Sequence, residues 1–239
     1  MLTIAHRGAS YSRPENTIPA FLEAWEVGAD VVEFDVRRAR DGLAVIHDAT
    51  VDRTTNGTGR VSDFTIEELS CLDAGDRAGV PSLELVLVAC RGRIMVNIEL
   101  KEEEIAAEVL DMIRTYGFID SAIISAFDVA PGEVVEESTS TWADLLWMKC
   151  KEPRIKISPL ARTYEDMIRA LDVARDHPLY AINLHASLIG EHALRAAHER
   201  GVLVWAWTVD ELAKIRWMKM RGVDGIISNV PHLLLDRQG

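Results

Sequence analysis

The chain has 239 residues, 48% of them hydrophobic and 27% charged, which argues against disorder and suits a folded protein of one domain, or two at most. Its formal net charge of −12 argues against a nucleic-acid partner, because binding a phosphate backbone requires clustered Lys and Arg. No window approaches 18 uncharged apolar residues and the first residues lack a secretory pattern, so we expect a cytoplasmic protein without stable membrane insertion.

Short β-branched runs alternate along the chain with longer segments of helical periodicity. We predict strands at 2–5, 31–36, 94–100, 122–125, 143–148, 180–184, 202–207 and 225–228, and helices at 17–27, 83–91, 103–116, 132–139, 164–176, 190–200 and 211–221. Eight strands in 239 residues correspond on average to about 30 residues per unit, the size of a βα repeat. This repeat predicts an α/β fold with a parallel sheet, and eight units suit a closed (β/α)8 barrel.

Local signals support the helix ends and one interruption of the repeat. Glycines that follow helical runs, at positions 28, 117, 201 and 222, are expected to end those helices in the left-handed conformation. Between the second and third units, a turn-rich run at 54–60 precedes a capping box from Thr65 to Glu68. Because this stretch is too long for an ordinary βα loop, we expect a small insertion at 48–82 at the barrel mouth, within a single domain of residues 1–239.

Carboxylates occur late in two of the predicted strands. Glu33 and Asp35 are two residues apart, so their side chains point to the same face of a strand, about 7 Å from each other, close enough to share one cation. The apolar residues around them predict a strand buried on both faces, where unpaired carboxylates are costly. Glu99 and Lys101 repeat the spacing at the end of the third strand, which adds a third carboxylate and an ammonium.

Two histidines follow short apolar runs near these carboxylates. His6 follows the first strand, next to Arg7, and His47 follows the run 43–46. Reactive residues of such a barrel lie at the C-terminal ends of its strands, so we expect both histidines beside the cation site. Of the two tryptophans that end the strand 202–207, we expect Trp207 to face the interior at the mouth and Trp205 to pack outward.

Three cysteines, Cys71, Cys90 and Cys150, are scattered and odd in number. Neither a zinc site nor a disulfide framework is supported by their spacing. We expect reduced side chains that serve in packing.

A series of short motifs runs in order along the whole chain. They are His6-Arg7-Gly8-Ala9, Pro14-Glu15-Asn16-Thr17, Glu33-Phe34-Asp35-Val36, Asp41-Gly42 with His47-Asp48, Arg53-Thr54-Thr55-Asn56-Gly57-Thr58-Gly59, Pro81-Ser82-Leu83-Glu84, Asn97-Ile98-Glu99-Leu100-Lys101, Trp207-Thr208-Val209 and Gly222-Val223-Asp224-Gly225-Ile226-Ile227-Ser228-Asn229. Taken jointly, these motifs resemble the glycerophosphodiester phosphodiesterase family. One departure is Asp210, where the motif usually has Asn.

The resemblance implies a TIM barrel with a small insertion after the second strand, and a hydrolase that cuts glycerophosphodiesters to glycerol phosphate and an alcohol. It implies one divalent cation, Mg²⁺ or Ca²⁺, as cofactor. By the same resemblance, each candidate residue has a role: Glu33, Asp35 and Glu99 bind the metal, His6 and His47 form the acid–base pair, Arg7 and Lys101 bind the phosphate, Glu15 lies close to the metal or to Arg7, and Trp207 stands beside the glycerol.

Several alternatives remain open from the residues alone. The nucleophile is water, or a neighbouring glycerol hydroxyl that first forms a cyclic phosphate, and either histidine suits either proton transfer. A related lipid phosphodiesterase, lysophospholipase D-like, or a sugar phosphodiesterase would use the same barrel. A noncatalytic phosphate-binding module and a metal-dependent sugar isomerase are further alternatives from other classes. The alcohol head group, the preferred metal and the oligomeric state are not predicted.

Overall fold

The strands of the computed structural model form one closed barrel. The structure describes residues 1–129 and 138–235. Its strands in these residues are β1 (Leu2–His6), β2 (Val31–Arg38), β3 (Leu43–Val45), β4 (Met95–Leu100), β5 (Ala122–Ala126), β6 (Lys156–Ala161), β7 (Ala181–His185), β8 (Leu203–Trp207) and β9 (Gly225–Ser228). Each strand except β3 is parallel to its neighbours, and pairing of β1 with both β9 and β2 closes the ring. The predicted eight-stranded TIM barrel is confirmed.

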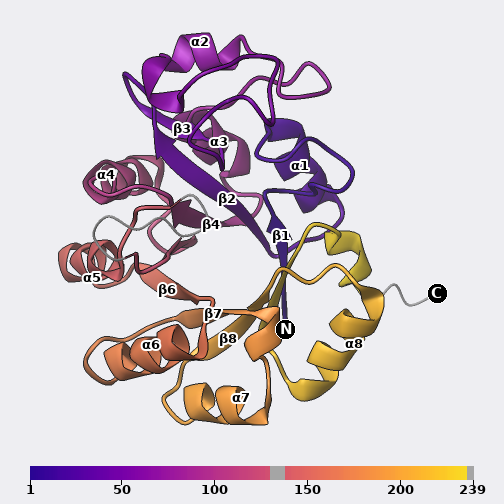
Figure 1. Cartoon of the computed structure of the whole chain (residues 1–239), viewed down its shortest axis with the longest axis vertical. Helices are drawn as coiled ribbons and strands as arrows, with labels where there is room; N and C mark the ends of the chain where they lie inside the picture. Colours follow the sequence, from indigo (N-terminus) through magenta and orange to yellow (C-terminus); the bar gives the residue numbers. More distant parts are fainter. Residues whose placement is uncertain (130–137, 236–239) are drawn as a thin grey trace.

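Helices surround this barrel on its outside (Figure 1). In the described residues they are α1 (Ile18–Glu26), α2 (Ile66–Ser70), α3 (Leu83–Cys90), α4 (Ala106–Tyr116), α5 (Trp142–Lys151), α6 (Tyr164–Asp176), α7 (Glu191–His198) and α8 (Leu212–Arg221), with short 3₁₀ turns η1 (Val61–Asp63), η2 (Ala186–Leu188) and η3 (Pro231–Leu233). All of the α-helices except α2 alternate with the barrel strands. The expected left-handed helix ends are found, as at Gly117 and Gly222, whose φ angles are 74° and 81°.

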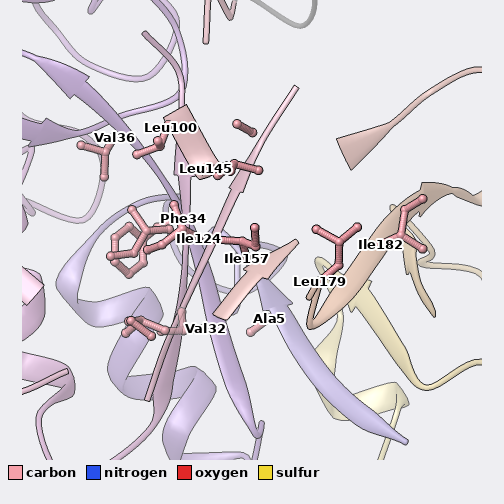
Figure 2. Packing of buried hydrophobic residues seen from close by; sticks show 14 of the residues in the cluster. Ala5, Val32, Phe34, Val36, Leu100, Ile124, Leu145, Ile157, Leu179 and Ile182 are labelled. Atoms are coloured by element: carbon pink, nitrogen blue, oxygen red, sulfur yellow. The ribbon is translucent and has the colours of Figure 1, made fainter. Parts of the chain in front are cut away.

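The main core lies between the barrel strands and these helices. Val32, Phe34 and Val36 of β2 gather on one side of the strand, as Figure 2 shows, and the Phe34 ring lies 5.4 Å from that of Phe21 on α1. Since side chains alternate along a strand, this outward packing leaves Glu33 and Asp35 pointing into the barrel.

A second apolar cluster lies inside the barrel. It consists of Ile4, Val31, Ile123, Ala181, Trp205 and Ile227. The expectation that Trp205 packs outward is therefore wrong. Residues 205 and 207 are two apart on β8, so both side chains point to the same, interior face.

The prediction of a strand at 143–148 is also wrong. These residues belong to α5, and the strand of this unit is β6, which had not been predicted. Residues 143–148 carry no β-branched side chain, and Thr141 and Asp144 form a capping box that begins the helix. The helix predicted at 132–139 lies almost wholly outside the described residues.

The segment after β2 builds the extra structure at the mouth. β3 pairs with β2 in the antiparallel direction, with Val45 opposite Val36. Beyond β3, the turn η1 and helix α2 enclose a small apolar cluster of their own, made of Ala39, Ala44, Ile46, Val51, Val61, Leu69, Ala74 and Val80. The predicted capping box is present, since Thr65 Oγ1 accepts from the Glu68 backbone and Glu68 Oε2 accepts from the Thr65 backbone.

All three cysteines are free, but only Cys90 is buried, so the packing role predicted for Cys71 and Cys150 is wrong. Among the described residues, no helix combines the length and the apolar character needed to cross a bilayer.

Candidate active site

The candidate residues lie together because their strands are neighbours in the barrel. In the parallel register, His6 on β1 is opposite Glu33 on β2, and Asp35 on β2 is opposite Glu99 on β4. Segments almost a hundred residues apart in sequence therefore meet at the C-terminal end of the barrel. This is the end at which barrels of this kind place their reactive groups.

Three carboxylates form the centre of this arrangement. Glu33, Asp35 and Glu99 each offer an oxygen within 4.8 Å of the other two. They are 3%, 1% and 9% exposed, and Glu33 Oε1 has no hydrogen-bond partner among the described residues. Buried hard oxygen donors of this kind suit Mg²⁺ or Ca²⁺, so the donor set fits a divalent cation.

Two cationic side chains flank the carboxylates. Lys101 Nζ lies 2.8 Å from Glu99 Oε1 and 3.6 Å from Asp35 Oδ1, and its side chain is 1% exposed. Arg7 donates its backbone N–H to Glu33 Oε2 at 2.9 Å, and its Nε lies 3.4 Å from Asp35 Oδ2. With all five groups ionised, the set carries one net negative charge, which a divalent cation would convert to one net positive charge.

The two carboxyl groups of β2 respond to this crowding in opposite directions. Burial, reinforced by the charges of Asp35 and Glu99, raises the pKa of Glu33 well above its usual value. Burial acts in the same sense on Asp35, but Arg7, Lys101 and His47 outweigh it and hold the pKa of Asp35 below its usual range. Of the two carboxyl groups, Glu33 therefore has the higher affinity for a proton.

His6 is held by a side chain from the last strand end. Its Nδ1 lies 2.7 Å from Asn229 Oδ1, while Asn229 Nδ2 and its backbone N–H both donate to the carboxylate of Asp210. Because a carboxylate only accepts, the amide orientation is fixed and His6 Nδ1 must be the donor. Burial, with a contribution from Arg7, lowers the pKa of His6 to about 4. The neutral ring therefore carries a free lone pair on Nε2.

His47 is held by a carboxylate instead. Its Nδ1 lies 2.7 Å from Asp48 Oδ1. Burial raises the pKa of Asp48, but its bonds to Arg53 and His47 outweigh burial and lower the pKa to about 2, so the group is ionised and accepts the His47 proton.

Arg53 connects Asp48, the partner of His47, with Glu15, the partner of Arg7. Its Nε and Nη2 donate to Asp48 Oδ2 and Oδ1 at 2.5 and 2.7 Å, and its Nη1 and Nη2 donate to Glu15 Oε2 and Oε1 at 2.9 and 2.8 Å. Glu15 Oε1 in turn accepts from Arg7 Nη1 at 2.8 Å. Glu15 therefore contacts Arg7 and not the carboxylate cluster.

A cavity of about 110 Å³ lies at this end of the barrel. From the predicted set, it is lined by His6, Arg7, Glu33, His47, Glu99, Lys101 and Trp207. Sequence reasoning missed three further polar lining residues that lie in the barrel strands, Asn97, Ser125 and Asn183. It also missed Asp48, Arg53 and Asn229 as partners, although all three stand in the motifs that carry the family resemblance and two are close to His47 in sequence.

The sequence is similar to known phosphodiesterases over its whole length. The model of the glycerophosphoryl diester phosphodiesterase family matches residues 6–233. A glycerophosphodiester phosphodiesterase of Caldanaerobacter subterraneus subsp. tengcongensis is 36% identical over an alignment of 249 residues, which covers 98% of this chain and 96% of the relative. One of Bacillus altitudinis is 32% identical and aligns over 95% of this chain and 94% of its own.

Solved structures agree with the fold. The crystal structure of a glycerophosphodiester phosphodiesterase from Agrobacterium tumefaciens superposes with a TM-score of 0.77 at 29% identity, covering 98% of this chain and 99% of the other. A phosphodiesterase of Oleispira antarctica, in complex with the product sn-glycerol-3-phosphate, gives a TM-score of 0.82 at 23% identity, covering 98% and 95%. At that identity the second likeness bears on the fold alone.

Proposed function

The chain belongs to the glycerophosphoryl diester phosphodiesterase family, and from this premise we propose that it is a divalent-cation-dependent hydrolase that cleaves glycerophosphodiesters to glycerol phosphate and an alcohol. The observation that carries the proposal is the convergence of three buried carboxylates, two cationic side chains and two oriented histidines, all of which except Asp35 line one cavity. The relatives at 36% and 32% identity, both glycerophosphodiester phosphodiesterases, support the substrate class.

The carboxylates of Glu33, Asp35 and Glu99 are the proposed ligands of Mg²⁺ or Ca²⁺. A bound cation would supply positive charge to a nonbridging phosphate oxygen. The unpartnered Glu33 Oε1 supports this role, because a buried acceptor without a donor is unfavourable unless a ligand satisfies it.

Arg7 and Lys101 bind the phosphate in this proposal. A phosphodiester monoanion repels nucleophiles, so its charge must be compensated before attack. Both side chains already lie at the carboxylate cluster, and Lys101 has lost nearly all of its solvent. Their charges therefore act in a site with little screening. Trp207, which lines the same cavity from the end of β8, is proposed to contact the glycerol.

The two histidines transfer the protons, and their partners suggest how the roles divide. His6 Nδ1 donates to a neutral amide, so Nε2 can accept a proton from the nucleophile. His47 Nδ1 donates to the carboxylate of Asp48, whose negative charge stabilises the protonated ring, so Nε2–H can protonate the departing alkoxide. We therefore assign His6 as base and His47 as acid. The nucleophile is water or the neighbouring glycerol hydroxyl, and release of a cyclic glycerol phosphate would identify the second.

The test is hydrolysis of a panel of glycerophosphodiesters by the purified protein. Release of glycerol phosphate should be abolished by EDTA and restored by Mg²⁺ or Ca²⁺. His6→Gln and His47→Gln should each lower kcat by about 10² to 10⁴-fold, the usual contribution of one proton-transfer group. The control is His177→Gln, because His177 is exposed at the end of α6 and distant from the cavity.

Two results would contradict the proposal. One is turnover that EDTA leaves unchanged, which would remove the cation from the reaction. The other is normal kcat in both folded histidine variants, which would remove the acid–base pair.

A further inference from the structure

Part of the cavity is lined by uncharged polar side chains from the barrel strands. Asn97 lies on β4, Ser125 on β5 and Asn183 on β7, and each is at most 1% exposed. Ser125 is opposite Glu99 in the strand register, so this polar group, which we call the cavity floor, adjoins the carboxylate cluster.

Polar atoms of the cavity floor lack partners. Both side-chain polar atoms of Asn97, Oγ of Ser125 and Nδ2 of Asn183 have no hydrogen-bond partner among the described residues. Asn183 is oriented by Ser158, whose Oγ donates to Asn183 Oδ1 at 2.6 Å. The Nδ2 donor of Asn183 is therefore the atom that has no acceptor among the described residues. Folded proteins leave few buried polar atoms unpaired. Their concentration at one cavity therefore points to a ligand that carries both donors and acceptors.

The wall beside the floor is apolar. Phe127, Val129 and Leu160 form a small cluster against Trp207, and the Phe127 and Trp207 rings lie 5.6 Å apart, edge to face. Trp207 Nε1 donates to the backbone oxygen of Asn183 at 2.9 Å, which fixes the indole at the edge of the floor. The carboxylates lie on β2 and β4, whereas Trp207 lies on β8, which neighbours neither of those strands. The combination of apolar wall and uncharged polar floor suits a short carbon chain with hydroxyl groups.

We propose that Asn97, Ser125 and Asn183 form a subsite that hydrogen-bonds the glycerol hydroxyls of the substrate and thereby selects a glycerol ester over a plain alkyl ester. This rests on the proposed function for the orientation of the substrate, with its phosphate at Arg7 and Lys101. A hydroxyl is both donor and acceptor, which matches an amide and a serine side by side.

The test is calorimetric binding of sn-glycerol 3-phosphate and of propyl phosphate, which lacks the hydroxyls, in the presence of Mg²⁺. We expect the unsubstituted protein to bind glycerol phosphate about tenfold more tightly than propyl phosphate, the effect of one to two neutral hydrogen bonds. Ser125→Ala should weaken glycerol phosphate binding by about fivefold and leave propyl phosphate within about twofold. Asn97→Leu, of similar size, is the second variant, and Ser70→Ala is the control, because Ser70 is exposed at the end of α2 and does not line the cavity.

The binding results test the subsite, and the hydrolysis results test the proposed function. Equal affinity of the unsubstituted protein for the two phosphates, or an equal loss for both in Ser125→Ala, would overturn the subsite. Because binding is measured without turnover, discrimination between the two phosphates would support the subsite even if no glycerophosphodiester were hydrolysed. Absence of hydrolysis would count against the proposed function alone.

Discussion

Arg53 links the carboxylate that holds His47 to the carboxylate that holds Arg7. One guanidinium makes paired bonds to Asp48, which holds His47, and to Glu15, which holds Arg7. Planar paired donation of this kind is specific to arginine. Arg53 contacts neither the carboxylate cluster nor the cavity lining, so its effect on the reaction must pass through its partners. It is a positioning residue.

Arg53→Lys should lower kcat about tenfold, a loss near 1.4 kcal/mol, with KM changed less than about twofold. The ammonium keeps the charge but cannot bond both carboxylates in pairs, so His47 and Arg7 lose their fixed relation while the cavity stays intact. Steady-state kinetics at saturating Mg²⁺ measures both parameters.

Arg40→Lys is the matched control for this prediction. Arg40 also bonds a carboxylate, at Glu68 Oε2, and a backbone oxygen, at Asp63, but its side chain is 53% exposed and outside the cavity. If both variants lose activity equally, or if Arg53→Lys acts on KM alone, the positioning role is contradicted.

At this scale, the sequence predicted charged residues better than uncharged ones. The carboxylate pair on β2 followed from a period of two, and its meeting with Glu99 followed from the common end of parallel strands. Asn97, Ser125 and Asn183 gave no such signal, because an asparagine in a strand looks the same whether or not it finds a partner. Only the three-dimensional arrangement shows that their polar atoms are unpaired.

At the scale of elements, pattern reasoning succeeded where periodicity was strong and failed where it was ambiguous. Most predicted strands and helices were found within a few residues of their predicted ends. The error at α5 came from a short apolar run, 143–148, whose length alone cannot distinguish strand from helix. β6 was missed because Pro159 lies within it, and proline has no N–H for a sheet and usually argues against a central strand.

Gly8 shows how tightly the loop after β1 packs against α1. Its φ is +83°, and a Cβ at this position would lie 2.6 Å from Ala20 Cβ and 2.7 Å from the Ala20 carbonyl carbon. The next residue, Ala9, donates its N–H to Ala20 O at 3.0 Å. No side chain can therefore be added without moving the loop that carries Arg7.

Gly8→Ala should lower the free energy of unfolding by about 1–2 kcal/mol for the left-handed conformation and by about 1–3 kcal/mol more for the displaced contact. Urea denaturation followed by circular dichroism measures the loss. Gly92→Ala is the control, since Gly92 also has a positive φ, +70°, but a Cβ there would meet no atom within 4 Å. Equal losses in the two variants would contradict the steric part of the argument.

At the scale of the whole molecule, barrel closure is what makes a site from these residues. His6 lies on the first strand and its partner Asn229 follows the last, and they meet because β1 pairs with β9. The sequence predicted the barrel through its repeat but not this contact, since nothing local links positions 223 apart. Closure also explains why Asp210, far from His6 in sequence, controls the orientation of its partner.

We propose that residues 48–82 are an insertion within the single domain 1–239 and do not fold independently of the barrel. The apolar cluster of this insertion includes Ala44 and Ile46, which belong to or adjoin β3, and β3 is paired to barrel strand β2. Arg53 adds bonds from the insertion to Glu15 in the loop after β1. The insertion therefore has no complete core when the barrel strand is absent.

The expected result is one unfolding transition, with the same urea midpoint for the barrel and the insertion. All six tryptophans lie outside residues 48–82, so intrinsic fluorescence reports on the barrel. Cys71, exposed at the end of α2, reports on the insertion when it carries a maleimide dye in a Cys150→Ser variant. Cys90 stays unlabelled at neutral pH because it is buried and burial raises its pKa to about 12.

The same dye on Cys150 in a Cys71→Ser variant controls for the label, since α5 belongs to the barrel. The prediction is contradicted if the Cys71 dye reports a lower urea midpoint than tryptophan while the Cys150 dye reports the same midpoint as tryptophan. The insertion would then unfold separately, because its apolar cluster and the bonds of Arg53 would be too weak to couple it to β2.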